Sequence, residues 1–307
     1  MIASSPADTA IDTSDFLPFK GQLSAYAAYF ERCLAEYEST LHIEPSVLSD
    51  SFLYSLNLGG KRIRPVLLFA TAKMLGFDLS KTVPFAVAIE MIHTYSLIHD
   101  DLPAMDNDDF RRGKPSNHKV FGEGQAILAG DALLNTAYSV LFGECAKGEE
   151  YVRAAKYICD AAGVFGMIAG QAADLAACED GRVGMAEYEF IVVGKTAKLI
   201  QAPMVAAAIL ARSEHVKEIE ELAENLGWLF QITDDILDET SSLAVLGKSV
   251  GKDKKENKLT AVRLTGLAEC YTLADEYAAR CKEILLRIAP EEKFLYKMIE
   301  YFRIRTR

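Results

Sequence analysis

Two clusters of aspartate residues stand out, because carboxylates grouped in this way can bind divalent metal ions. The first occupies residues 100–106, where Asp100 and Asp101 are followed by Asp106, directly after an apolar segment. Pro103 disfavours helix at the residue before it, so the chain is expected to bend there. The bend would bring the Asp106 carboxylate back towards Asp100, which makes this segment a candidate metal-binding site.

The second cluster follows the apolar run 226–230 and contains Asp234, Asp235 and Asp238. Asp234 and Asp238 are four residues apart and therefore share one face of a helix. Carboxylates near a helix C-terminus repel one another and oppose the helix dipole, so divalent cations would stabilise both clusters. Hard oxygen ligands without His or Cys favour Mg²⁺. A solvated acidic loop is the alternative for either cluster alone, but two clusters on apolar helices favour the metal interpretation.

Basic residues lie near both clusters in the sequence, as the binding of a diphosphate would require. Guanidinium groups bind phosphate oxygens in pairs, whereas lysines act as point charges. Ordinary surface charge is the alternative interpretation for the lysines of residues 252–255. It is a poor explanation for Lys61 and Arg64, which follow two glycines. The basic residues are Lys61 and Arg64 upstream, Arg111 and Arg112 after the first cluster, and Lys248 and the lysines of residues 252–258 after the second.

The composition indicates a folded, globular protein rather than a disordered chain. Of 307 residues, 50% are apolar and 25% are charged, which allows a large buried core. The formal net charge of −11 argues against general nucleic-acid binding, because that binding requires many Lys and Arg residues to neutralise phosphates. An anionic substrate must therefore meet local positive charge or a metal ion.

Several features predict a cytoplasmic protein without an integral membrane segment. The six cysteines are scattered and lack the spacing of a metal site, so buried free thiols in a reducing compartment are expected. Residues 1–15 lack the basic and apolar regions of a secretory signal. We also expect no apolar run to reach the length that a bilayer requires.

Apolar residues recur at three- and four-residue spacing along most of the chain, and strand patterns are scarce, so we predict an all-α fold. The segment 83–98 is apolar on every side and is predicted to be a central helix. Polar breaks are spread too evenly to mark a boundary, so residues 1–307 are predicted to form one domain, with a poorly ordered segment at 1–20. The predicted helices span residues 22–40, 65–75, 83–101, 125–145, 151–162, 163–177, 185–193, 196–212, 217–238, 259–287 and 292–302.

The ordered set of motifs resembles a known family, the trans-type isoprenyl diphosphate synthases, and within it the bacterial farnesyl diphosphate synthases. The resemblance runs from about residue 53 to residue 267. A single aspartate motif would be a weak signal, whereas the whole set in this order is very specific. Its anchors are Gly-Gly-Lys-Arg-Ile-Arg-Pro at 59–65, the block 92–113, Gly170-Gln171, Gly-Lys-Thr at 194–196, residues 230–235, Gly247-Lys248 and Lys258.

The resemblance implies the isoprenoid synthase fold, a bundle of long helices around a central active-site cavity, usually as a homodimer. The two aspartate motifs would face each other across the cavity mouth. The metal ligands implied are Asp100, Asp106 and Asp234, which would bind three Mg²⁺ ions with Asp101 and Asp238 in support. Arg111, Lys195, Thr196, Gln231, Lys248 and Lys258 would line the allylic site, and Lys61, Arg64, His93 and Arg112 would hold isopentenyl diphosphate.

The implied reaction is a head-to-tail condensation of isopentenyl diphosphate with an allylic diphosphate. Mg²⁺ and basic groups stabilise the departing diphosphate, and the double bond of isopentenyl diphosphate attacks the allylic cation. In the family the released diphosphate takes the proton. Lys195, Thr196 and Gln231 are the predicted catalytic residues, and we hypothesise that Thr196 and Gln231 place oxygen dipoles against the cation.

Other polar residues receive weaker interpretations. His93 lies on an apolar helix and would be a core histidine without its family position. His99 and His118 are interpreted as core residues. Gln171 and Asp174, three residues apart on one helix face, are second-rank site candidates.

Tyr95 and Ser96 are predicted to set product length. They precede Asp100 by five and four residues, so the Tyr95 ring would lie about a turn beneath the metal site. This pattern resembles that of bacterial synthases making (2E,6E)-farnesyl diphosphate from dimethylallyl and geranyl diphosphate. Two departures from the family pattern bear on the product. Residues 191–193 stand where a segment containing His more commonly precedes the Lys-Thr pair, and Ala197 stands where Gly is usual.

Alternative functions remain open at this point. A geranylgeranyl or longer-chain synthase is the main alternative. A cyclising terpene synthase would not need Lys61, Arg64 and Arg112. A non-catalytic subunit of a heteromeric synthase usually has eroded aspartate motifs, and a purely structural helical protein would leave both clusters unexplained.

Overall fold

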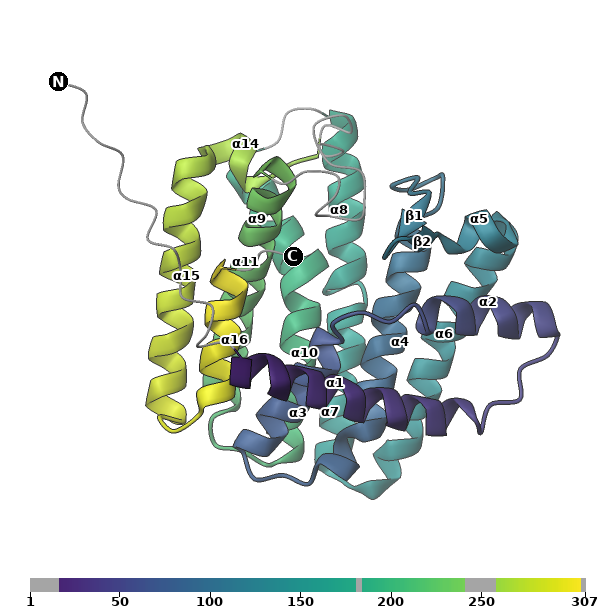
Figure 1. Cartoon of the computed structure of the whole chain (residues 1–307), viewed down its shortest axis with the longest axis horizontal. Coiled ribbons are helices and arrows are strands. Elements are labelled where there is room, and N and C mark those ends of the chain that lie inside the picture. Colours follow the sequence, from purple (N-terminus) through teal and green to yellow (C-terminus); the bar gives the residue numbers. More distant parts are fainter. Residues whose placement is uncertain (1–16, 181–183, 241–257, 305–307) are drawn as a thin grey trace.

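Long helices packed side by side form most of the molecule, and the all-α prediction is confirmed (Figure 1). The computed structural model describes residues 17–180, 184–240 and 258–304. The helices are α1 (Leu17–Glu38), α2 (Ser46–Leu56), α3 (Ile63–Met74), α4 (Val83–Asp100), α5 (Asn117–Phe121), α6 (Glu123–Glu144), α7 (Glu149–Ala162), α8 (Met167–Asp180), α9 (Met185–Ile191), α10 (Lys198–Leu210), α11 (Val216–Thr240), α14 (Ala261–Thr265), α15 (Leu267–Ile288) and α16 (Lys293–Ile304). Short helical turns η2 (Leu79–Thr82), η3 (Cys145–Lys147) and η4 (Val192–Ala197) connect some of them.

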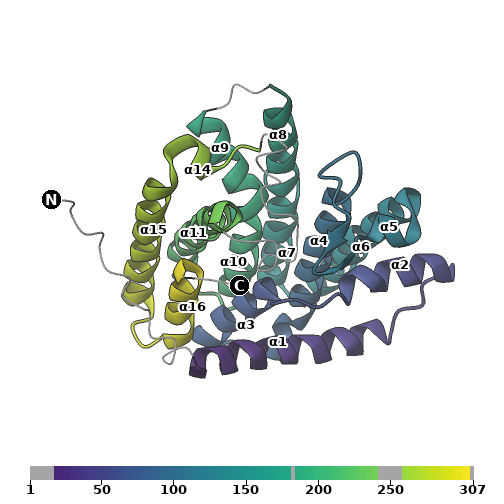
Figure 2. The same ribbon diagram turned by 45° about the horizontal axis from the view of Figure 1, so that its top comes forward.

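Helix α10 lies in the middle of the bundle, between α11 and α4 (Figure 2). Every residue from Leu199 to Leu210 is buried, because a helix that is apolar on all sides must be surrounded by other helices. Ile200, Met204 and Ala208 face the apolar cluster of α11, α15 and α16. The opposite face of α10 packs into the cluster built on α4, α6 and α7, so α10 joins the two halves of the core.

Helix α4, which we predicted to be central, is buried along most of its length, including Phe85–Ile92. It packs against α6, α3 and α10. Its last turn is different, because His93, Ser96, His99 and Asp100 are only partly buried. The apolar body of α4 therefore anchors the helix in the core while its C-terminal end reaches a cavity.

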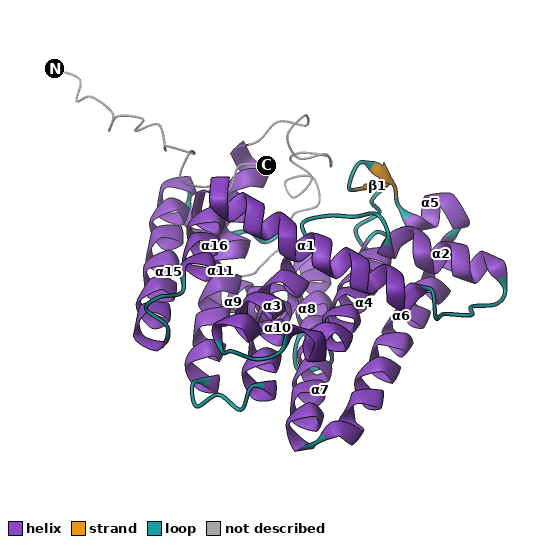
Figure 3. Cartoon of the chain, turned by 60° about the horizontal axis from the view of Figure 1, so that its bottom comes forward, coloured by secondary structure: helices purple, strands orange, loops and turns teal. Residues whose placement is uncertain are grey.

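A short hairpin was not predicted from the sequence. Strands β1 (Phe110–Arg111) and β2 (Lys114–Pro115) pair in antiparallel fashion and are the only strands in the described parts of the chain (Figure 3). Arg112 and Gly113 form the turn, with φ values of 54° and 76°. Positive φ at both turn residues suits a two-residue hairpin loop. The hairpin was missed because strands of two residues are too short to show an alternation of apolar and polar residues. Helices α2 and α5 were also missed.

Gly266 divides the helix predicted at 259–287 into α14 and α15. Its φ of 88° lies in the left-handed region, which glycine adopts without strain. The Thr260 hydroxyl caps α14 by accepting a hydrogen bond from the Arg263 amide at 3.3 Å. The sharp turn allows Lys258 to lie close to the cavity mouth instead of continuing α15.

Three helical stretches are long and apolar enough, by length and composition, to cross a membrane: Glu123–Lys147, Glu149–Cys178 and Met185–Leu210. The expectation that no apolar run reaches this length is therefore wrong, because isolated polar residues such as Asp131 do not break a long apolar helix. Within the fold, α6 packs on α4, and α10 packs on α7 and α11. Most of the stretch Met185–Leu210 is buried in this packing, whereas most of the other two stretches is not.

All six cysteines are free thiols, as predicted. Cys270 and Cys281 are buried, whereas the other four are partly exposed, so the expectation of burial holds for two of the six.

Candidate active site

The two aspartate clusters lie on one cavity, as the sequence predicted. Its volume is about 630 Å³, and its wall comes from α4, α6, α8, α9, η4, α11 and residues 258–260. The sequence-predicted residues on this wall are Arg64, His93, Tyr95, Ser96, Asp100, Asp106, Arg111, Gln171, Asp174, Lys195, Thr196, Gln231, Asp234, Asp238 and Lys258. Segments more than 130 residues apart in the chain therefore contribute to a single site.

Two predicted substrate-binding residues lie away from the cavity wall, and a third falls outside the described part of the chain. The ammonium group of Lys61 lies 5.3 Å from the ring centroid of Tyr301 and is not on the cavity wall. Arg112 is also off the wall and donates a hydrogen bond to the carbonyl oxygen of Gly59. Lys248 lies outside the described residues.

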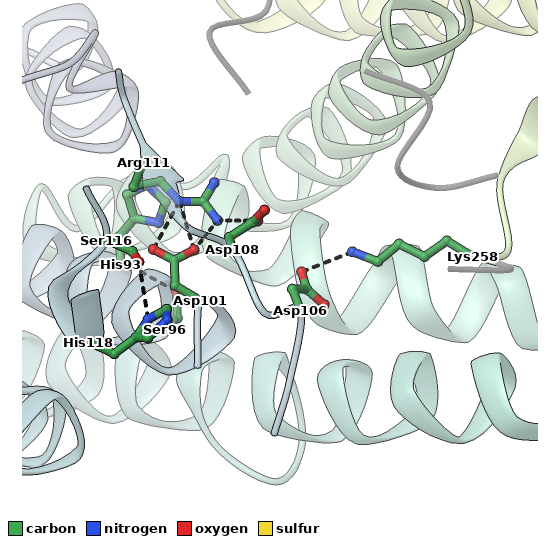
Figure 4. Close-up of polar contacts among 9 residues, drawn as sticks. All are labelled: His93, Ser96, Asp101, Asp106, Asp108, Arg111, Ser116, His118 and Lys258. Atoms are coloured by element: carbon green, nitrogen blue, oxygen red, sulfur yellow. Dashed lines mark hydrogen bonds and ion pairs between the residues drawn. The ribbon is translucent and has the colours of Figure 1, made fainter. Parts of the chain in front are cut away.

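Residues 100–106 bend as predicted. The Asp106 amide donates a hydrogen bond of 2.8 Å to the Asp100 carbonyl oxygen, which returns the chain to the end of α4. Lys258 then reaches Asp106 from the other side of the mouth, with 2.9 Å between Nζ and Oδ2 (Figure 4). One carboxylate of the first cluster is thus already paired with a cation from the C-terminal part of the chain.

The second aspartate of the first cluster, Asp101, is buried and binds Arg111 rather than facing the cavity. Arg111 also contacts Asp108, with 3.3 Å between Nη2 and Oδ2 (Figure 4). Two carboxylates therefore hold this guanidinium in place at the cavity wall. Asp108 was not recognised from the sequence, because only the hairpin brings it towards Arg111.

Electrostatics at the mouth favour a bound cation. Burial and, to a smaller extent, the nearby carboxylate of Asp106 raise the pKa of Asp100 to about 6, although the positive charges of Lys195, Arg111 and Lys258 oppose this shift. Within the described ranges, no three His, Cys, Asp or Glu side chains converge on a single point that could hold a metal ion. The carboxylates of Asp100, Asp106 and Asp234 on the cavity wall suit Mg²⁺, which commonly takes one or two carboxylates and completes its shell with water and substrate phosphates.

Lys195 and Thr196 lie on η4, a π-helical turn between α9 and α10. The Lys195 ammonium donates to Asp174 at 2.5 Å, and the Thr196 hydroxyl donates to Oε1 of Gln231 at 2.7 Å. Asp174, a second-rank candidate from the sequence, therefore holds the Lys195 side chain at the cavity wall. Single-turn π-helices often occur at functional sites.

Glycines set the position of η4. A Cβ atom on Gly170 of α8 would lie 2.1 Å from the Lys195 backbone nitrogen, and one on Gly227 of α11 would lie 2.5 Å from the Ala197 Cα atom. Both contacts are far too short for a side chain. Backbone contact on two sides therefore brings Lys195 and Thr196 between α8 and α11.

Part of the cavity wall is apolar. Leu134, Met167, Leu199 and Phe230 line it, and of these only Phe230 falls in a motif quoted from the sequence, the anchor 230–235. Tyr95 is 5% exposed, and its hydroxyl has no hydrogen-bond partner in the described structure. Tyr95 thus lies on the wall of the same cavity as Asp100, whereas its effect on product length remains a prediction.

A second group of basic side chains lies beside the first cluster. Burial lowers the pKa of Arg64 to about 10, so the guanidinium stays charged at neutral pH, and its Nε atom has no partner within the described ranges. Burial and the nearby guanidinium of Arg64 lower the pKa of His93 well below its usual value, so its ring is neutral at pH 7. A buried charged donor facing the cavity suits an anionic ligand.

Arg62 has a different role from Arg64, although both belong to the same basic run. Its side chain is fully buried and donates to Glu90 at 2.8 Å, to Glu31 at 2.7 Å and to the Leu56 carbonyl oxygen at 2.9 Å. These contacts use its guanidinium for internal ion pairs. Sequence analysis missed Glu31 and Glu90, because their partner is decided only by how α1, α3 and α4 pack.

The two histidines interpreted as core residues differ. His118 is buried, and its Nδ1 lies 3.1 Å from the Ser116 hydroxyl. His99 instead lines the cavity, and its Nε2 lies 3.1 Å from the Ile127 carbonyl oxygen. The core interpretation of His99 is therefore wrong: it links the end of α4 to α6 at the cavity.

The family model described as polyprenyl synthetase matches residues 45–300, and the chain therefore belongs to this family of prenyltransferases. The farnesyl diphosphate synthase of Geobacillus stearothermophilus is 47% identical over 243 residues, which cover 78% of this chain and 81% of the relative. The chloroplastic geranylgeranyl pyrophosphate synthase of Catharanthus roseus is 41% identical over 287 residues, covering 91% and 79%. The solved geranyltransferase of Helicobacter pylori, complexed with magnesium and isoprenyl diphosphate, has a TM-score of 0.78 at 28% identity and covers 98% of both chains.

The predicted family and fold are thereby confirmed. Members of the family use isopentenyl and allylic diphosphates and depend on magnesium. The relatives divide between farnesyl and geranylgeranyl synthases, so they agree on the class of reaction and differ in product length.

Proposed function

We propose that this protein is a Mg²⁺-dependent synthase that condenses isopentenyl diphosphate with dimethylallyl and geranyl diphosphate to give (2E,6E)-farnesyl diphosphate. The observation that carries the proposal is a single cavity whose wall combines carboxylates of both aspartate clusters with apolar side chains. A prenyl diphosphate has the same division between a charged head and an apolar tail.

The charged head of the allylic substrate belongs at the mouth. Asp100, Asp106 and Asp234 would hold Mg²⁺, three ions when substrate is bound, and the metal would neutralise the leaving diphosphate. Lys195 and Lys258 stand beside these carboxylates and add positive charge where the diphosphate departs. Asp106 would exchange its bond to Lys258 for metal, which frees the ammonium group to bind phosphate oxygens.

The second substrate belongs beside Arg64, His93 and Arg112. Arg64 offers a buried donor at the cavity wall, and Arg112 lies against the loop at Gly59, near which Lys61 is also placed. Isopentenyl diphosphate held here would direct its double bond towards the allylic carbon. The apolar walls exclude water, which would otherwise quench the cation.

The direct test is incubation with isopentenyl diphosphate and dimethylallyl or geranyl diphosphate, followed by chromatography of the dephosphorylated alcohols. We expect farnesol as the main product with Mg²⁺ and none after chelation with EDTA. The absence of any elongated product from both primers would overturn the proposal. A main product of geranylgeraniol would support the alternative that the Catharanthus roseus relative favours.

We also propose a homodimer that acts in the cytoplasm. Exposed apolar side chains support the dimer: Ile127, Leu128 and Phe142 on α6 are 44%, 54% and 81% exposed, and Phe165 before α8 is 79% exposed. Free cysteines support a reducing compartment. Sedimentation velocity should give twice the 33.8 kDa chain mass, and cell fractionation should find the protein in the soluble fraction. A monomer, or a membrane pellet, would contradict the respective proposal.

A further inference from the structure

Asp235 belongs to the second aspartate cluster, but its side chain is only 5% exposed. Its Oδ1 accepts a hydrogen bond from the Gln231 side-chain amide at 2.8 Å. Its Oδ2 accepts from the Tyr188 hydroxyl and from the Ala261 backbone amide, both at 2.7 Å. A carboxylate has about four acceptor positions, and three of them are filled by donors from α9, α11 and α14.

The bond to Asp235 determines which way the Gln231 amide points. Gln231 presents its NH₂ group to Oδ1 of Asp235, so the amide oxygen of Gln231 faces the other way. That oxygen accepts the hydroxyl proton of Thr196 at 2.7 Å. Asp235 thereby sets the direction of a hydrogen-bond chain that ends at Thr196.

The direction matters for a reaction through a cation. With its proton directed to Gln231, the Thr196 hydroxyl keeps its lone pairs for other contacts, including a developing positive charge. A reversed Gln231 amide would donate to Thr196 and leave the hydroxyl proton directed elsewhere in the cavity. Electrostatic groups that are fixed before reaction contribute strongly to catalysis, so reversal would slow the chemical step.

Asp235 also joins α11 to the start of α14. Ala261 lies three residues after Lys258, whose ammonium group binds Asp106 at 2.9 Å. Holding the Ala261 amide therefore fixes the short segment from which Lys258 reaches across the cavity mouth. The same carboxylate connects the reacting centre with the cation at the mouth.

We propose that Asp235 is a positioning residue, not a metal ligand: it orients Gln231 and Thr196 and anchors the segment that carries Lys258. The inference rests on the proposed function. It assigns to the two adjacent aspartates different tasks, with Asp234 at the metal and Asp235 in the supporting hydrogen-bond network.

The test exchanges the functional groups of Asp235 and Gln231, whose side chains are hydrogen-bonded to each other. In Asp235→Asn the new amide donates towards Gln231, which must flip or lose the bond. In the double variant Asp235→Asn/Gln231→Glu, the new carboxylate at position 231 accepts from the new amide at position 235 and also from Thr196. Net charge, shape and the direction of the Thr196 bond are restored. Glu221→Gln is the matched control, because it is an exposed carboxylate on the same helix.

We expect Asp235→Asn to lower kcat about tenfold or more, because one oriented group is lost. The melting temperature should fall by about 4 °C. The binding of Mg²⁺ with inorganic diphosphate, measured by titration calorimetry, should stay within about twofold of the wild type. The double variant should recover most of the melting temperature and have a higher kcat than Asp235→Asn, and Glu221→Gln should change neither quantity.

Two results would overturn the inference. One is wild-type kcat in Asp235→Asn. The other is a tenfold or larger loss of Mg²⁺ affinity in Asp235→Asn that the double variant does not restore, which would make Asp235 a metal ligand. A wild-type protein that forms no prenyl product would instead refute the proposed function, and the melting temperatures of the four proteins would still test the pairing.

Discussion

Lys258 and Asp106 are 152 residues apart in the sequence, and their side chains meet at 2.9 Å across the mouth of the cavity. The pair joins the loop after α4 to the segment before α14. In the proposed reaction the same carboxylate is a metal ligand, so lysine and Mg²⁺ compete for it.

Replacing Lys258 with Gln should separate the two binding events. Mg²⁺ alone should bind about fivefold more tightly, because one nearby positive charge is removed. The KM for the allylic diphosphate should rise about tenfold, because a charged donor to phosphate is lost. Calorimetry without diphosphate and initial-rate kinetics measure the two effects. Lys119→Gln is the control, because Lys119 pairs with Asp109 away from the cavity, and unchanged values in both assays would contradict this prediction.

Metal binding should weaken at acidic pH. Burial raises the pKa of Asp100 to about 6, so the group is ionised at pH 7.5 and mostly protonated at pH 5.5. Mg²⁺ must displace that proton, and the apparent dissociation constant should therefore rise about fourfold between pH 7.5 and pH 5.5. Calorimetric titrations at both values test this. An equal pH dependence in Asp100→Asn would show that another group is responsible.

Shortening Tyr95 should lengthen the product. Tyr95 is almost fully buried and lines the same cavity as Asp100, so its replacement by Ala would open space for a longer prenyl chain. We expect the main alcohol to shift from C15 to C20 or beyond in a product-length assay. Tyr95→Phe should keep the C15 product, because the hydroxyl makes no hydrogen bond in the described structure and only ring size matters. Identical product profiles for the Ala and Phe variants would refute the stopper role.

The buried pair of Arg62 and Glu90 should be important for stability and for the second substrate. Their side chains are 0% and 1% exposed, so Glu90→Gln would leave a buried guanidinium poorly compensated and cost about 3 kcal/mol of unfolding free energy. Glu31, which is 42% exposed, bonds the same arginine, and Glu31→Gln should cost less than about 1 kcal/mol. Urea unfolding compares the two variants.

The same substitution should affect one substrate more than the other. Arg62 lies between Lys61 and Arg64, and it holds the backbone from which both side chains extend. The KM for isopentenyl diphosphate should rise about fivefold in Glu90→Gln, whereas the KM for geranyl diphosphate should change less than about twofold. Equal increases for both substrates would mean that the pair only stabilises the fold.

Local patterns in the sequence were sufficient for most of the helices and for the aspartate clusters. The bend that returns Asp106 to Asp100 follows from one proline, and the buried helices follow from their apolar periodicity. Pairings between distant residues were not accessible in this way. Tyr188 and Asp235 are 47 residues apart, and nothing local to either indicates that a hydroxyl of α9 ends on a carboxylate of α11.

Short-range signals also failed where structure depends on packing. The hairpin at 110–115 has strands of two residues, too short for an alternating pattern. Arg62 and Arg64 have the same chemistry and nearly the same position, yet one is bound internally and the other lines the cavity. Which side of the segment at α3 faces the cavity depends on how α1 and α4 pack against it. The basic run alone therefore could not distinguish Arg62 from Arg64.

The contact between Gly170 and the backbone at Lys195 has a practical consequence for engineering. Helix α8 and η4 already touch through main-chain atoms at Gly170 and Lys195, so no side chain can be trimmed at this contact, and the two backbones would have to separate to widen the chamber there. Such a separation would also displace Lys195 and Thr196. Designers seeking bulkier prenyl products should therefore remodel the α4 and α6 flank, where Tyr95 and Leu134 contribute removable volume.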